Sequence, residues 1–243
     1  MPARIQVFFL HLGASAFIAL AVIGLVFGLW YPSPLHTAVG VTGIFLMLLL
    51  IDVCLGPVLT FVVYKKGKKT LKMDLAVIVL LQLSALIYGV YAVAEGRPAW
   101  LVFANDRFEL VRALDIDARN LDKARIEYQA PSWLKPQWVA AMKPKNSEES
   151  VSIIFEALAG GSDIAEHPYL YQPLVEQKNK IKEQLHRVNE LTLYNSAEQV
   201  AEMLQHYPNV NGWLPLQAKN KDMVVLIDMS NLEQPVIVEL KPW

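Results

Sequence analysis

The sequence predicts a membrane protein in which three transmembrane α-helices are followed by a periplasmic α+β domain. Three observations lead to this fold class. Apolar segments long enough to cross a bilayer fill the first part of the 243-residue chain, a lysine cluster separates the second segment from the third, and the remainder mixes helical and strand patterns. We expect residues 1–95 to form the membrane domain and residues 96–243 the domain outside it.

The apolar segments run from about residue 5 to 31, 35 to 64 and 75 to 94. Each reaches the roughly 20 residues that a membrane helix needs. The first is too long for the apolar core of a cleavable signal peptide, and no small-residue cleavage site follows it before Trp30, so we expect a retained helix.

Two pairs of small residues mark places where helices can approach closely. Gly24 and Gly28 form such a pair in the first segment, and Ala85 and Gly89 form another in the third. The pairs either pack the three helices together or receive a helix from a partner. The sequence favours the first interpretation and leaves the second open.

A cationic loop between the second and third segments sets the orientation. Such loops stay in the cytoplasm, so we expect a multi-pass protein of the bacterial inner membrane with a cytoplasmic N-terminus and a periplasmic C-terminal domain. Binding of anionic lipid or of a cytoplasmic protein is a second possible role for this loop. Its lysines are Lys65, Lys66, Lys68, Lys69 and Lys72.

An aspartate interrupts the second segment. Asp52 lies about twelve residues from Tyr64, or roughly 18 Å along a helix, where a carboxylate costs about 2.5–3.5 kcal/mol on insertion scales. Pro57 lacks an N–H and predicts a kink nearby. Asp52, Gly56 and Thr60 follow at helical spacing and share one face, which makes that face thin and polar.

Three interpretations of Asp52 are open. It could hydrogen-bond to Gln82 or Ser84 of the third segment and fix the bundle, or it could face a groove and meet the membrane helix of a partner. It could also carry protons or ions. That role needs a relay of ionisable groups, and only His11 and Asp74 are available, near the cytoplasmic end.

Residues 97–243 predict one α+β domain. WLVF and RFELV read as two strands joined by a polar turn, and a proline-rich irregular region follows around residues 131–144. We expect Asp106, Arg107 and Glu109 to form a turn and surface pairs beside the membrane, where they would also touch a partner that leaves the bilayer. Helices are expected over 147–161, capped by Ser147 and ended by Gly160, over 172–191 and over 195–208, and strands over 222–229 and 235–240.

No pattern in the chain predicts catalysis, a cofactor or a metal site. The nucleophile-elbow, zinc-protease, P-loop and dinucleotide motifs are absent. The single Cys54 allows no disulfide within the chain, and no basic patch favours nucleic acid. His186 is expected on a solvated helix face. A metal at Glu166 and His167 is the less favoured interpretation of that pair.

The order of several motifs resembles the type IV pilin accessory protein family (TfpX/TfpZ, FimB-like). These motifs are YPSPL, IDVCLGPVLTFVVYKKGKKTLKMDL, QLSALIYG, GRPAWLVFANDRFE, WLPL and the final PW. The resemblance spans the chain and is strongest over residues 31–112. It implies an inner-membrane accessory factor or chaperone that stabilises or presents a type IV major pilin for fimbrial assembly, with no catalytic residue.

A major pilin keeps one apolar helix in the membrane and a head outside, so the resemblance implies contact at both levels. The residues that we expect at these contacts are Asp52, Gly56, Pro57, Gln82 and Ser84 in the membrane, and Asp106, Arg107, Phe108 and Glu109 outside. Other pilus assembly proteins and the lipid bilayer are further expected partners. The alternatives are a structural or regulatory subunit of the assembly machinery that does not bind pilin, and a small membrane transport component.

Overall fold

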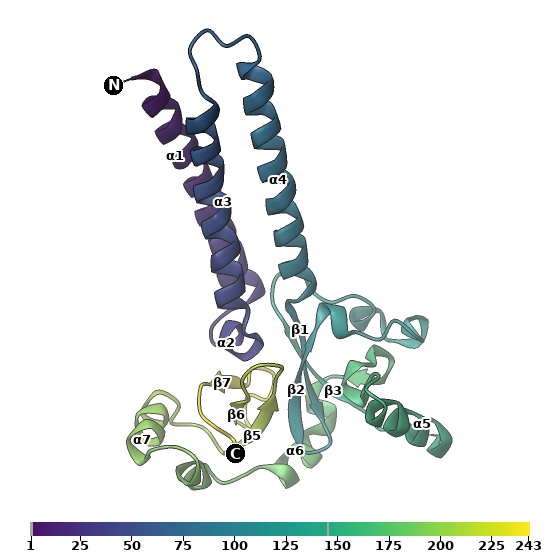
Figure 1. Cartoon of the computed structure of the whole chain (residues 1–243). Helices are drawn as coiled ribbons and strands as arrows, with labels where there is room; N and C mark the ends of the chain where they lie inside the picture. Colours follow the sequence, from purple (N-terminus) through teal and green to yellow (C-terminus); the bar gives the residue numbers. More distant parts are fainter. Residues whose placement is uncertain (1, 145) are drawn as a thin grey trace. The chain divides into compact units, whose positions relative to one another are not determined.

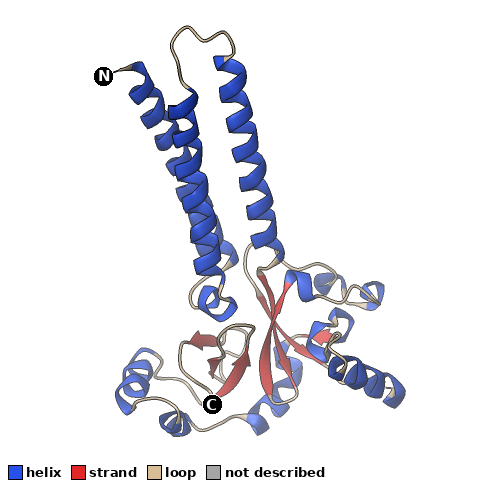
Figure 2. Cartoon of the chain, viewed as in Figure 1, coloured by secondary structure: helices blue, strands red, loops and turns tan. Residues whose placement is uncertain are grey.

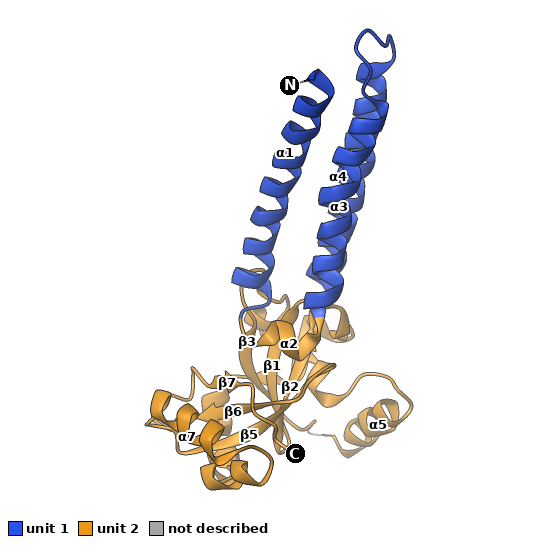
Figure 3. Ribbon diagram, turned by 60° about the vertical axis from the view of Figure 1, so that its left-hand side comes forward, with its two compact units in different colours: residues 1–32, 41–96 blue, residues 33–40, 97–243 orange. Residues whose placement is uncertain are grey.

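The computed structural model describes residues 2–144 and 146–243, which form two compact units (Figures 1 and 3). The first unit comprises residues 1–32 and 41–96, and the second comprises residues 33–40 and 97–243. A short segment between the first two long helices therefore belongs to the second unit, although it is separated from the rest of that unit in the sequence.

The first unit consists of three long helices. Helix α1 (Ala3–Leu25) continues through a π-helical turn, η1 (Val26–Trp30), and α3 (Val41–Val63) and α4 (Leu71–Glu95) follow. In the described part of the chain these are the three helices that are long and apolar enough to cross a membrane.

The expected second segment is wrong at its start. Gly40 has a φ of +78°, a left-handed conformation that ends the short helix α2 (Leu35–Val39) before α3 begins. At its other end α3 runs to Val63 with Pro57 inside it, so the proline does not divide the helix.

Helix α3 packs against both α1 and α4. His11 of α1 lies 2.7 Å from the hydroxyl of Thr60, and the rings of Phe27 and Phe45 meet edge to face at 5.6 Å. On the other side, Gly89 of α4 lies directly against Leu48, where a Cβ atom would collide with the leucine side chain. In α4, Gly89 of the small-residue pair therefore lets Leu48 of α3 approach the helix closely.

Gly24 and Gly28, the small-residue pair of α1, do not lie at a contact between the long helices. A Cβ atom built on Gly24 or on Gly28 would meet no described atom within 4 Å. These two glycines therefore do not pack α1 against α3 or α4, and the favoured interpretation of the pair is wrong.

The second unit is built on a mixed sheet (Figure 2). Within the described residues the strand order is β4-β3-β1-β2-β5-β6-β7. Pairs β1–β3 and β2–β5 are parallel, and the other neighbouring pairs are antiparallel. The strands are β1 (Pro98–Ala104), β2 (Arg107–Arg112), β3 (Gln137–Ala141), β4 (Tyr171–Gln172), β5 (Gly212–Gln217), β6 (Met223–Ile227) and β7 (Val236–Val238).

Strand β1 is an interior strand between β3 and β2, and it is buried along its whole length. Leu101 and Phe103 point into the core on one face of the sheet, and Trp100 and Val102 point into the core on the other. Coverage of both faces explains why this strand reads as a continuous apolar run instead of an alternating one.

Helices of the second unit are α5 (Ser147–Leu158), α6 (Lys178–Gln184) and α7 (Ala197–His206). Asn146, not Ser147, caps α5, and Gly160 follows α5 with a φ of +83°. Ser196 and Gln199 form a capping box for α7. Single 3-10 turns occupy Ala113–Asp115, Leu121–Lys123, Ile126–Tyr128, Ile164–Glu166, Pro168–Leu170, Leu174–Gln177 and Val188–Leu193.

The helix expected over residues 172–191 is wrong in its second half. Leu185 is extended, and His186 exchanges two backbone hydrogen bonds with Trp213, of 3.0 and 3.1 Å. These bonds draw the chain onto the edge of β5. Strands β3 and β5 were not expected either, because β3 starts beside Pro136 in a proline-rich region and β5 contains Pro215.

Helix α2 completes one core of the second unit. Leu35 and Ala38 are buried there with residues of β1, β2, β5 and β6. The carbonyl of Ala38 accepts hydrogen bonds from the backbone N–H groups of Asn220 (3.0 Å) and Lys221 (3.2 Å). Asn220 also packs against Gly40, where a Cβ atom would lie 2.7 Å from its side-chain carbon.

Candidate functional site

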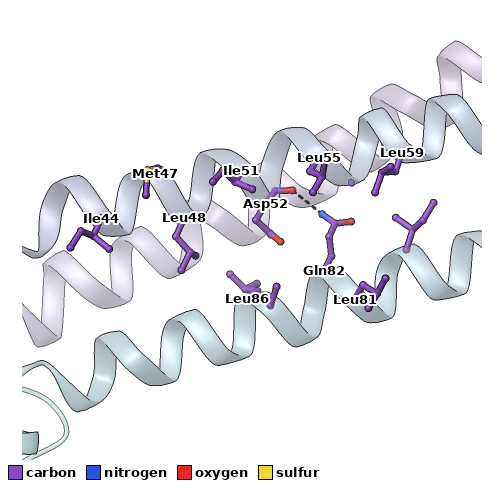
Figure 4. Close-up of a pocket in the computed structure, with 13 residues that line it drawn as sticks. Ile44, Met47, Leu48, Ile51, Asp52, Leu55, Leu59, Leu81, Gln82 and Leu86 are labelled. Atoms are coloured by element: carbon purple, nitrogen blue, oxygen red, sulfur yellow. Dashed lines mark hydrogen bonds between the residues drawn. The ribbon is translucent and has the colours of Figure 1, made fainter.

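An apolar groove of about 530 Å³ runs between α3 and α4 (Figure 4). Along α3 it extends from Ile44 to Leu59, which is about 22 Å at 1.5 Å per residue. Leu55 and Leu81 are more than half exposed on its walls. The lining residues are Ile44, Met47, Leu48, Ile51, Asp52, Leu55, Gly56, Leu59, Ile78, Leu81, Gln82, Ala85 and Leu86.

Asp52 and Gln82 are the polar residues of this groove, and they project toward each other from the two helices (Figure 4). The amide of Gln82 donates to the backbone carbonyl of Asp52 at 2.9 Å, and lies 3.5 Å from the hydroxyl of Ser15. Gly56 lets Gln82 approach, because a Cβ atom there would overlap the amide.

The expected bond between Gln82 and the carboxylate of Asp52 is therefore replaced by a bond to its backbone. Among the described residues, no hydrogen bond reaches the carboxylate of Asp52 or the buried Oε1 of Gln82. Ser84 is exposed and lies outside the groove. Unpaired acceptors in an apolar wall are costly, so this surface suits a partner that brings hydrogen-bond donors.

The groove is long and is lined by apolar side chains apart from Asp52 and Gln82, which suits an apolar helix. Its length approaches the hydrocarbon thickness of a bilayer, about 30 Å. Gly56 is buried beneath the wall and Pro57 lies beside it on α3. The sequence predicted a role for Asp52 and Gln82. It could not predict which apolar residues line the groove, because leucines that face the groove and leucines that face lipid have the same sequence pattern.

Within the described residues the other ionisable groups of the first unit are engaged elsewhere. His11 lies against Thr60, and Asp74 pairs with Lys68 at 2.8 Å and accepts from Thr70. Neither lines the groove, although His11 lies close enough to Asp52 to interact with its carboxylate electrostatically.

A second concave site lies in the α+β unit, at the β1–β2 turn. This turn pocket has a volume of about 350 Å³, and Asp106 and Arg107 line it together with several aromatic side chains. The imidazole of His186 stacks on the indole of Trp213 at 4.7 Å. The lining residues are Asp106, Arg107, His186, Glu190, Leu193, Tyr194, Trp213, Pro215, Pro242 and Trp243.

Strand β1 separates this turn from the start of the α+β unit. Strand β1 rises from Pro98 to Ala104, so Asp106 lies about 20 Å along the sheet from the residue that follows α4. His186 is exposed as expected, but it is not in a helix, because its backbone bridges to Trp213 and its ring lines the pocket. Only the folding of distant segments brings these aromatic residues together.

Phe108 and Glu109 do not line the turn pocket. Phe108 is fully buried and packs edge to face on Trp138 at 5.1 Å, so it is a core residue. Burial raises the pKa of Glu109 to about 7, and the neighbouring carboxylates of Asp163 and Glu166 contribute, whereas Arg107, 3.5 Å away, opposes the rise.

Replacing Glu109 by glutamine should make the α+β unit less sensitive to alkaline pH. The folded pKa of Glu109, about 7, lies above its ordinary value of 4.5, so its protonated form is the stabilising one. The contribution is complete below pH 4.5 and is lost as pH rises through about 7, a difference of about 3 kcal/mol at most. Thermal unfolding of the detergent-purified chain at pH 5 and pH 8 measures this.

The expected result is that Glu109→Gln raises the midpoint at pH 8 and leaves it nearly unchanged at pH 5. Glu233→Gln, at an exposed carboxylate, is the control and should change neither value. Equal pH dependence in wild type and Glu109→Gln would contradict the assignment.

Glu166 and His167 do not converge on a metal site. The carboxylate of Glu166 caps the backbone N–H of Asp163, whereas His167 is buried 3.6 Å from Asp117. Among the described residues no group of three His, Cys, Asp or Glu side chains is arranged to hold a metal.

The surroundings of His167 are those of a structural cluster. Burial lowers the pKa of His167, and the hydrogen bonds from Arg119 hold the pKa of Asp117 well below its usual range. Arg119 also pairs with Glu156 of α5. The cluster therefore ties α5 to the segment that follows β2.

Comparison with known proteins finds fimbrial assembly proteins. A model of the fimbrial assembly protein FimB matches residues 1–40. The fimbrial assembly proteins of serogroups E1 and I of Dichelobacter nodosus are each 33% identical over 175 residues, which are 71% of this chain and 68% of theirs. Another, of serogroups C1 and C2, is 35% identical over 117 residues, 47% of this chain and 89% of its own.

No solved structure matches the chain. The relatives of serogroups E1 and I share its sequence over more than two thirds of their own length. The chain therefore belongs to the FimB-like family of type IV pilus fimbrial assembly proteins.

Proposed function

We propose that this protein is an inner-membrane accessory factor that acts as a chaperone for a type IV major pilin. The α3–α4 groove holds the apolar membrane helix of the pilin until the pilin enters the growing pilus. The observation that carries this proposal is the groove itself, an open apolar channel of helix length with the unpaired carboxylate of Asp52 in its wall. Family membership supports a role in pilus assembly without catalysis.

The groove offers both affinity and release. Apolar walls give a membrane helix close packing, and Gly56 keeps the wall thin. Asp52 and the Oε1 of Gln82 give it polar contacts that lipid chains cannot supply. A pilin helix that satisfies these groups is preferred over lipid, and a helix that satisfies them incompletely is still free to leave.

The chain connectivity supports a topology with three spans. Residues 33–40 and residues 97–243 belong to one compact unit, and α3 and α4 lie between them in the sequence. The chain must leave and rejoin the same side of the membrane, which two crossings accomplish. The lysine loop then lies on the opposite, cytoplasmic side, and the α+β unit lies in the periplasm.

The turn pocket is the proposed contact for the pilin head. Its aromatic side chains provide contact area for a partner. Its two charged turn residues, Asp106 and Arg107, provide selectivity at the same place. Tyrosine, tryptophan and arginine are the residues that most often dominate protein interfaces. The turn pocket, outside the membrane, would therefore select among pilins. The groove, within the membrane, would retain the pilin helix without selecting among pilins.

Photo-crosslinking in cells that express the cognate pilin tests the proposal. Probes at Leu55 and Leu59 face the groove, whereas probes at Val58 and Val62 lie exposed on α3 away from it. A further probe at Arg107 reports on the turn pocket, because Phe108 is buried and unsuitable.

We expect crosslinks to pilin from the groove positions and from Arg107, and several-fold fewer from the two control positions. Crosslinks to another assembly protein alone would favour a structural or regulatory subunit that does not bind pilin. Equal yields at all four positions of α3 would overturn the groove as the binding site.

A further inference from the structure

An exposed loop precedes strand β3. Between Pro131 and Pro136 the side chains of Trp133 and Leu134 are each 62% exposed, and Lys135 beside them is exposed as well. The loop is ordered by a hydrogen bond of 3.1 Å from the backbone N–H of Leu134 to the hydroxyl of Ser132. A large aromatic residue and a leucine held outward in this way form an apolar tip.

The sheet register places this tip at the end of the sheet where β1 begins. Strands β1 and β3 are parallel, with Trp100 opposite Gln137. The residues that precede Gln137 therefore lie at the end of the sheet where β1 begins. A side-chain contact agrees with it, because the guanidinium carbon of Arg97 lies 4.2 Å from the centre of the Trp133 ring.

Arg97 also fixes the distance of the tip from a membrane helix. Helix α4 ends at Glu95, two residues before Arg97, and two peptide units span at most about 7 Å. The backbone carbonyl of Arg97 accepts a hydrogen bond of 2.9 Å from Ala113, which holds it in the sheet domain. Trp133 therefore contacts a residue that follows the end of α4 by two positions in the chain.

The chemistry of the tip matches the membrane–water interface. Each interfacial layer is roughly 5–8 Å thick, and tryptophan is enriched there because its ring is amphipathic. Lysine can extend its ammonium group from this depth to the headgroups. A protein partner would also accept Trp133 and Leu134, but the link to α4 favours the lipid.

We propose that the loop of residues 131–136 inserts Trp133 and Leu134 into the outer interface of the bilayer, as a second attachment of the periplasmic domain. This inference rests on the proposed crossing of the membrane by α4, and does not depend on pilin binding. The attachment limits rotation of the domain about the end of α4.

Fluorescence depth measurement in nanodiscs tests the attachment. The full chain carries Cys54→Ser, so that a single introduced cysteine can be labelled with an environment-sensitive dye. The probe site is Leu134→Cys. Leu80→Cys, exposed on α4, reports on the span, and Leu193→Cys, exposed at the turn pocket, is the matched control outside it. Phosphatidylcholine with spin labels at the headgroup or along the chain supplies the quencher.

We expect the dye at Leu134→Cys to be quenched by headgroup and shallow-chain labels at least threefold more than the dye at Leu193→Cys. It should also be protected from aqueous iodide. Accessibility to iodide equal to that of Leu193→Cys would overturn the proposal, and so would protection from both iodide and lipid labels, which would show that protein covers the tip. Absence of lipid quenching at Leu80→Cys would instead contradict the span, and with it the proposed function.

Discussion

Ala38→Asp is expected to unfold the α+β unit although the residue lies far from that unit in the sequence. Ala38 is fully buried in the core that it shares with β1, β2, β5 and β6. An aspartate there would be an unpaired buried charge in a tightly packed site, which costs several kcal/mol. A domain of ordinary stability, about 5–15 kcal/mol, loses a large part of its margin.

Limited proteolysis of membranes that contain the intact chain measures this effect. Digestion should remove residues 97–243 of Ala38→Asp at protease levels that leave the wild type intact, while the long helices stay protected. Ser33→Asp adds the same charge to the same segment at an exposed position and controls for effects on insertion. Ala130→Asp repeats the substitution at an exposed position of the domain. Equal resistance of Ala38→Asp and both controls would contradict the role of α2.

Asp52→Leu should reduce the amount of pilin recovered with the protein by about tenfold or more. The loss of one desolvated, charge-assisted hydrogen bond is worth about 1.5–3 kcal/mol, and each 1.4 kcal/mol changes an affinity tenfold. The protein itself should insert as well as the wild type, because no described hydrogen bond to its carboxylate is lost and leucine enters a bilayer more readily.

Two variants sharpen this test. Asp52→Asn keeps an acceptor oxygen of similar shape and should retain more pilin than Asp52→Leu. Cys54→Leu changes an exposed neighbour on α3 that does not line the groove and should leave recovery unchanged. If Asp52→Leu is degraded while Cys54→Leu accumulates normally, Asp52 stabilises the bundle and the groove loses its proposed use.

Hydropathy alone predicts the three long helices because their composition determines them. The start of the second helix was harder to predict, since residues 35–39 adjoin the apolar segment in the sequence, but Leu35 and Ala38 are buried in the α+β core. Gly40, with its left-handed backbone, separates α2 from α3. The sequence alone does not show whether a glycine adopts a positive φ. Gly24 and Gly28 show the same limit of prediction from sequence. Their spacing predicts a place where a helix can approach closely, but it does not show which helix, if any, packs there.

Local patterns in the α+β unit predicted β1, β2, α5 and α7, whose turn and cap residues are explicit. They failed where distant contacts decide the structure. Strand β5 pairs on both sides despite Pro215, and His186 leaves a helical pattern to bridge to Trp213. Asp52 stood out in the sequence because it is costly in a membrane, whereas the turn pocket depends on residues from four separate segments and has no local signature.

The joint between α4 and β1 has a mechanical consequence. Only Gly96 and Arg97 separate the helix from the strand, and β1 is an interior strand, hydrogen-bonded to β2 on one side and to β3 on the other. The withdrawal of a bound helix would pull on α4. That force would be transmitted to an interior strand of the sheet. Two ladders share that load, whereas the edge strands β4 and β7, which could be peeled away one bond at a time, carry no tether.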